Sequence, residues 1–192
     1  MPRAILDKKI QLLFDEVLIL DSMVEEATLG AVQALKKQDL KAARRYYTYD
    51  QAINQKRYQL ENEVIVTIAT QQPVMASDLR TLASLFEISG ELERMGDYAK
   101  GIAYICLLIG NQPLVKPLID IPKMAEITVG MLNRAVNAFI SGDVESAKQI
   151  PEEVDEVDEL YNQVYRVLVA VLFAVPATID RANFLMRAAL TL

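Results

Sequence analysis

"AVQALKKQDLKAARRYYTYDQAIN", residues 31–54, aligns without a gap on "AVNAFISGDVESAKQIPEEVDEVD", residues 135–158. The alignment pairs Asp39 with Asp143 and Asn54 with Asp158 at one common spacing along the chain. Self-similarity at a fixed spacing is the signature of an internal structural repeat. The sequence therefore predicts a duplicated unit.

Helical spacing of apolar residues runs through both copies. In the first segment these residues are Ile10, Leu13, Val17, Leu20, Val24, Ala27, Ala31 and Leu35. Intervals of three and four predict an amphipathic helix. A second helix is expected over 40–70, with Asp39 as its N-cap, and Pro73 interrupts the chain beyond it. A third is expected from a cap at Ser77 or Asp78 to about Ile109.

The segment "GNQPLVKPLIDIP", residues 110–122, holds three prolines and predicts a linker. We expect a first three-helix repeat over 1–110, a linker over 111–122 and an incomplete second repeat over 123–192. The last helix, from about Ile179, stops at Leu192, where the first copy continues through "ELERMGD". The predicted fold class is all-α, with two tandem three-helix bundles side by side and the last helix truncated.

Composition excludes several classes of function. The chain of 192 residues has no histidine, which removes imidazole bases and imidazole metal ligands. A net charge of −6 argues against nucleic-acid binding, which needs clustered basic residues. The apolar run at 167–175 is too short to span a membrane, and no signal peptide is evident. Together with a single cysteine, Cys106, expected in the core, these features predict a cytoplasmic protein that is not embedded in a membrane.

Paired acids are the candidate metal ligands. In "GELERMGDYAKGI", residues 90–102, Glu93 and Asp97 lie one helical turn apart and repel each other unless a cation lies between them. Arg80 or Arg44 is expected to supply counter-charge in a structure without metal. Oxygen ligands favour hard cations such as iron, magnesium or manganese. A solvated acidic face is the alternative, and from spacing alone it is the commoner arrangement.

Glycine favours the functional interpretation. Gly96, between the two acids, costs a helix about 1 kcal/mol relative to alanine, which predicts close approach of another helix or of a ligand. Gly90 is expected to allow the same close approach of another helix or of a ligand.

Two further acid sets repeat the pattern. Asp50 and Asn54 are four residues apart on the second predicted helix. Asp155 and Asp158 lie in the acidic run "PEEVDEVDE" of the second copy, where a solvated helix start is the alternative interpretation. The position that matches Asp50 there is Val154, so this second site is expected to be incomplete.

Several of these motifs, in this order, resemble those of the PhoU family. They are "DQAIN" at 50–54, "QQPVMASDLR" at 71–80 and "ERMGD" at 93–97. The "QPVMASDLR" stretch has one residue more than the family's usual pattern, and the second Glu-Arg-x-Gly-Asp motif is missing. The resemblance spans nearly the whole chain.

The resemblance implies a regulator of phosphate uptake that is not an enzyme. It implies docking to the ATPase subunit of the phosphate transporter and to a phosphate-sensing histidine kinase, and assembly as a homodimer or larger homo-oligomer. It also implies a metal ion bound by Asp50, Asn54, Glu93 and Asp97. The alternative is a metal-free helical scaffold or adaptor with solvated acidic faces. A ferritin-like di-metal enzyme is disfavoured because it needs Glu-x-x-His pairs.

Overall fold

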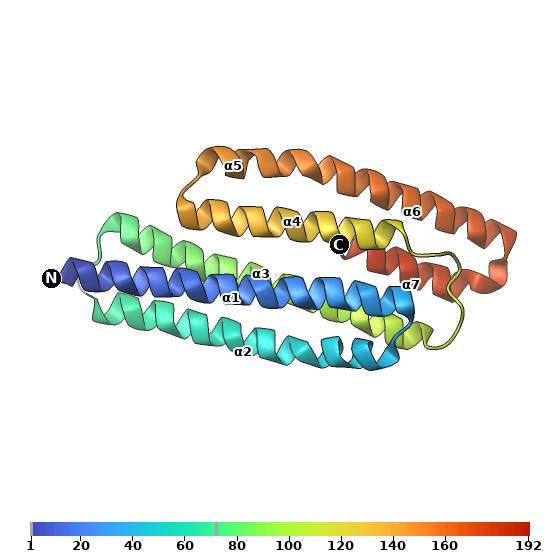
Figure 1. Cartoon of the computed structure of the whole chain (residues 1–192), viewed down its shortest axis with the longest axis horizontal. Coiled ribbons are helices and arrows are strands. Elements are labelled where there is room, and N and C mark those ends of the chain that lie inside the picture. Colours follow the sequence, from blue (N-terminus) through green and yellow to red (C-terminus); the bar gives the residue numbers. More distant parts are fainter. Residues whose placement is uncertain (1, 72) are drawn as a thin grey trace.

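The computed structural model describes residues 2–71 and 73–192, and within them the chain is helical with no β-strand (Figure 1). The α-helices are α1 (Pro2–Lys37), α2 (Leu40–Thr70), α3 (Ala76–Ile109), α4 (Asp120–Ser141), α5 (Val144–Gln149), α6 (Val154–Ala174) and α7 (Ile179–Leu190). Two short 3₁₀ helices, Ile150–Glu153 and Pro176–Thr178, precede α6 and α7. The predicted all-α fold is confirmed. None of the described helices is both long and apolar enough to cross a bilayer.

The duplicated turns have equivalent caps. Asp39 accepts hydrogen bonds from the backbone N–H groups of Lys41 and Ala42, each at 3.0 Å. Its counterpart Asp143 accepts one from the backbone N–H of Ser146, also at 3.0 Å, and one from the Ser146 hydroxyl at 2.6 Å. The hydroxyl bond, followed by the backbone bond, lowers the pKa of Asp143. The preceding residues, Gln38 and Gly142, both have positive φ, as required where a helix ends in a left-handed residue. The Asp39 cap is confirmed.

The predicted cap of the third helix was wrong. The N-cap position of α3 is Met75, with no side-chain cap, so neither Ser77 nor Asp78 caps the helix. Asp78 instead lies in the first turn, where it is buried and pairs with Arg3 of α1. Gln72 of the "QQPVMASDLR" motif lies outside the described residues.

The second repeat departs from the first in its middle helix. Pro151 falls where α2 runs without a break in the first copy, and its ring prevents the ladder of hydrogen bonds from continuing. The helix is therefore divided into α5, a 3₁₀ turn and α6. Between α3 and α4, residues 110–119 contain no helix.

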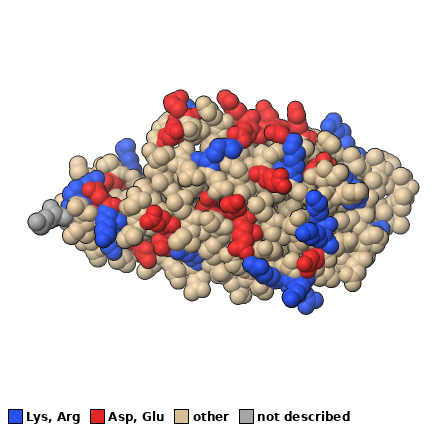
Figure 2. Space-filling model, viewed as in Figure 1, with Lys and Arg blue, Asp and Glu red and all other residues tan. Residues whose placement is uncertain are grey.

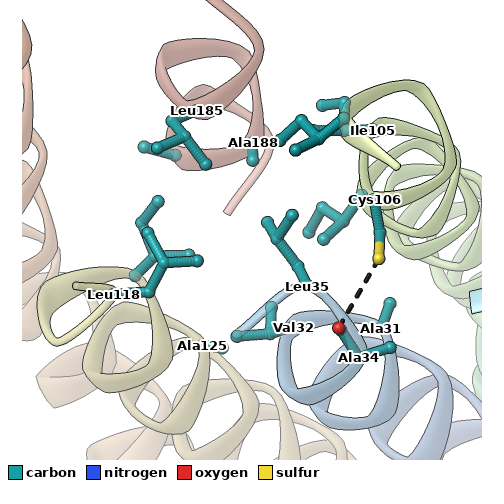
Figure 3. Close-up of a cluster of buried hydrophobic side chains, with 14 of the residues drawn as sticks. Ala31, Val32, Ala34, Leu35, Ile105, Cys106, Leu118, Ala125, Leu185 and Ala188 are labelled. Atoms are coloured by element: carbon teal, nitrogen blue, oxygen red, sulfur yellow. Dashed lines mark hydrogen bonds between the residues drawn. The ribbon is translucent and has the colours of Figure 1, made fainter. Parts of the chain in front are cut away.

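A shared core joins the two repeats. One buried cluster takes side chains from α1, α3, α4, α6 and α7, with Cys106 among them (Figure 3). The Cys106 Sγ lies 3.5 Å from the backbone oxygen of Ala34, and the residue is 1% exposed, so the predicted core position is confirmed. A second cluster fills the first bundle and includes Val136 of α4. The second repeat thus packs on α1 and α3 instead of enclosing a core of its own.

Candidate functional site

The four predicted ligands of the first repeat lie on two helices that pack along each other. Asp50 and Asn54 are on α2, and Glu93 and Asp97 are on α3. Asp50 is buried, Asn54 and Glu93 are partly buried, and Asp97 is exposed. The fold therefore brings the acids of both motifs to the same pair of helices.

A lysine that is not among the predicted site residues connects these helices. The Nζ of Lys100, on α3, lies 2.8 Å from Asp50 Oδ2 across the helix interface and 3.4 Å from Asp97 Oδ1 on its own helix. The hydrogen bond to Asp50 is the main cause that raises the pKa of Lys100. The ammonium is thus the cation that Asp50 and Asp97 share.

An arginine neutralises the remaining acid. Arg57 Nη1, on α2, lies 3.2 Å from Glu93 Oε2, and Arg57 Nε lies 3.2 Å from Glu61 Oε1. The guanidinium also lies over the ring of Tyr58, 4.7 Å from its centroid. Arg57 and Lys100, rather than the expected Arg80 or Arg44, carry the counter-charge.

The site keeps an excess of negative charge. Four carboxylates, those of Asp50, Glu61, Glu93 and Asp97, face two bases, which leaves two formal negative charges uncompensated. In addition, Asp50 Oδ1 is buried without a hydrogen-bond partner. A buried polar atom without a partner is uncommon in native proteins. Asp50 and Asn54 also line an open groove of about 630 Å³ along α2.

The oxygen donors fit a hard cation in their chemistry, but not in their present arrangement. Within residues 2–71 and 73–192, no three Asp, Glu or Cys side chains lie together as a metal site requires. The position between Asp50 and Asp97 is taken by the ammonium of Lys100. A metal ion therefore fits this pair only where Lys100 moves away.

Glycine brings the two helices together at this point. A Cβ on Gly96 would lie 3.0 Å from both Cδ1 and Cγ2 of Ile53, a fully buried residue of α2. The predicted close approach at Gly96 is confirmed. The same prediction for Gly90 was wrong, because a Cβ there would meet nothing within 4 Å.

The acids of the second repeat lie in a different environment. Asp155 and Asp158 are both exposed in the first half of α6. Figure 2 shows acidic side chains along the edge of the molecule formed by α5 and the start of α6. Two neighbours in this run form ion pairs with α4: Glu153 with Arg134, and Glu156 with Lys123. Nothing in this arrangement brings Asp155 and Asp158 together with acids of α7, whose only acid is Asp180.

Two features of the molecule were missed from the sequence. Lys100 follows Asp97 by three residues, so its ion pair along α3 was detectable from helical spacing. Its contact with Asp50 depends on how α2 and α3 pack and left no local signal. Asp21 interrupts the apolar stripe of α1 next to Leu20 and is only 2% exposed, which the spacing also signals.

The fold and the site together define a class: an all-helical protein of two structural repeats, the first of which brings acids of two neighbouring helices together. The PhoU domain family matches residues 17–106 and 121–190, one stretch in each repeat. The chain belongs to the PhoU family.

Curated relatives and solved structures agree with this membership. The chain is 37% identical over 171 residues to the phosphate-specific transport system accessory protein PhoU homolog of Aquifex aeolicus, covering 89% of this chain and 77% of that protein. The homolog of Clostridium acetobutylicum is 29% identical over 172 residues, covering 90% of this chain and 78% of that protein. The structure of PhoU from Pseudomonas aeruginosa aligns with a TM-score of 0.88 at 25% identity over 96% of this chain and 88% of that one. The PhoU structure from Streptococcus pneumoniae, with a TM-score of 0.87 at 24% identity over 97% and 87%, shares the fold.

Proposed function

We propose that the protein is a regulatory accessory protein of phosphate transport, which restrains uptake when phosphate is ample. The observation that carries this proposal is the match of the PhoU domain to both repeats, together with relatives named as phosphate-specific transport system accessory proteins, which align over about nine-tenths of this chain. The protein acts by docking, in the cytoplasm, to the transporter's ATPase subunit and to the phosphate-sensing histidine kinase. It acts without catalysis of its own.

The test is a deletion strain that carries a reporter of phosphate starvation. In ample phosphate the reporter should be active in the deletion strain and silent once the chain is restored. A pull-down from the restored cells should recover the ATPase subunit or the kinase, whereas an unrelated helical bundle used as bait should recover neither. A reporter that stays silent in the deletion strain, or a bait that recovers neither partner, contradicts the proposal.

We also propose that the acidic face shared by α2 and α3 binds a hard cation through Asp50, Asn54, Glu93 and Asp97. The buried, unpartnered Oδ1 of Asp50 and the excess negative charge support this proposal. A bound cation would supply positive charge between the two helices. Asp155 and Asp158, exposed and without acidic partners on α7, form at most a weaker second site.

Elemental analysis and Mn²⁺ titration of purified variants test the cation proposal. The double substitution Glu93→Ala with Asp97→Ala should abolish binding at this face and leave the helices formed, because neither side chain belongs to the two buried apolar clusters. The substitution Asp155→Ala with Asp158→Ala is the matched control and should change binding little. Binding that persists unchanged in the Glu93/Asp97 variant would place the ion elsewhere and leave these acids as a solvated face. An unmodified protein that binds no metal favours the metal-free scaffold.

A further inference from the structure

Asp50 is a buried carboxylate beside the ammonium of Lys100. Its side chain is 7% exposed, and one of its two oxygens, Oδ2, lies 2.8 Å from Lys100 Nζ. The other oxygen, Oδ1, is buried without a partner. A buried carboxylate in this setting needs positive charge, and Lys100 is the group that supplies it.

Lys100 is held in place from both helices. Its Nζ lies 3.4 Å from Asp97 Oδ1 on α3 and 6.0 Å from the ring centroid of Tyr47 on α2. Its side chain nevertheless keeps 34% of its surface exposed, so a route to solvent is open. A lysine stem with four rotatable bonds can follow that route without any movement of the backbone.

We propose that Lys100 is a built-in cation of the α2–α3 acidic site and that it competes with metal ions for the position between Asp50 and Asp97. This inference rests on the proposed cation site and adds a control on its occupancy. An ammonium and a divalent cation repel each other at such short range, so both cannot occupy the space between the same two carboxylates. Each metal-binding event must therefore displace Lys100 to solvent, and Lys100 sets the affinity.

Substitution of the lysine tests this competition. Lys100→Met keeps most of the side chain's length and removes its charge, so it should bind Mn²⁺ at least tenfold more tightly than the unmodified protein in a titration followed by the electron paramagnetic resonance of free Mn²⁺. Lys100→Arg, which keeps the charge, should bind at the unmodified level or more weakly. Lys123→Met is the matched control, because it removes an ion pair with Glu156 on the exposed α4–α6 face and should leave the affinity unchanged.

Thermal unfolding supplies a second readout. Without metal, Lys100→Met should melt at a lower temperature, since Asp50 then stays buried and charged without a cation. Mn²⁺ should raise the melting temperature of Lys100→Met more than that of the unmodified protein. The double variant Asp50→Asn with Lys100→Met, which removes both charges, should regain stability and lose the Mn²⁺ effect. It serves as a folded control if the single variant Lys100→Met folds poorly.

The outcomes separate this inference from the proposal on which it rests. Unchanged or weaker Mn²⁺ binding by Lys100→Met overturns the role of Lys100. A failure of both proteins to bind overturns the cation site itself and this inference with it. Binding by the unmodified protein that survives Glu93→Ala with Asp97→Ala overturns the location of the site instead. Binding that is lost in that acid variant but unaltered in Lys100→Met leaves the site in place and removes only the competition.

Discussion

Replacing Asp21 with asparagine should stabilise the protein at neutral pH. Asp21 lies on the same face of α1 as Phe14 and Glu25, which contact Phe139 and Asn133 of α4 respectively. It is therefore buried where the second repeat covers the first, and its Oδ1 has no hydrogen-bond partner. Burial, with a smaller contribution from Glu25, raises the pKa of Asp21 from 3.8 to about 6.

The sign and size of the effect follow from this shift. Because the folded state holds the proton more tightly than the unfolded state, stability is lost as pH rises from about 3.8 through about 6. Two pKa units correspond to about 3 kcal/mol at pH 7.5. Asparagine removes the charge but still buries an amide, which costs about 1 kcal/mol. The free energy of unfolding should therefore rise by about 2 kcal/mol in Asp21→Asn at pH 7.5. At pH 5 this gain should be smaller by more than about 1 kcal/mol.

Urea denaturation followed by circular dichroism at 222 nm measures both values. Asp15→Asn, on the exposed face of the same helix, is the control and should change the free energy of unfolding by less than about 0.5 kcal/mol at either pH. An Asp21→Asn protein that is no more stable than the unmodified chain at pH 7.5 would refute the reasoning. A gain that is equal at the two pH values would show that the charge of Asp21 is not its source.

Two further predictions concern glycine and cysteine. Gly90→Ala should stabilise the protein by about 1 kcal/mol in the same urea assay, because alanine favours the helix and nothing lies within 4 Å of the new methyl group. Gly96→Ala should destabilise it, because its methyl group meets the fully buried Ile53 at 3.0 Å, and equal effects of the two substitutions would contradict this account. Cys106, with a thiol pKa raised to about 11 by burial, should react with a thiol reagent at pH 8 only as fast as the protein unfolds. Rapid labelling of the folded protein would place this thiol outside the core.

The helices were predictable because their signals are local. Apolar spacing, the Asp39 cap and the breaks near Gln38 and Pro73 each act within a few residues, and the structure places α1 and α2 at the expected limits. The start of α3 was misplaced because Asp78 has the chemistry of a cap but is drawn into an ion pair with Arg3, far away in the sequence. A local pattern cannot represent that competing contact.

The site was predictable only in part for the same reason. The acids at Asp50 and Asp97 follow helical spacing, and their gathering on one helix pair follows from the duplicated three-helix pattern. The basic residue that neutralises each acid depends on how far side chains reach between α2 and α3. The ion pairs of Arg57 and Lys100 are therefore visible only in the packed structure. The identity of a bound ion stays a prediction from donor chemistry and family resemblance.

The core that both repeats share limits how this molecule can transmit a signal. Two domains joined by a flexible tether can swing about a hinge and report a ligand by changing their separation. Here, Ile105 of α3, Leu35 of α1 and Leu185 of α7 belong to one buried cluster, so a rotation of one half would open a cavity in the other (Figure 3). Information must therefore pass as altered surface charge, local rearrangement of side chains or a change of binding partner, with the helical body serving as a rigid platform.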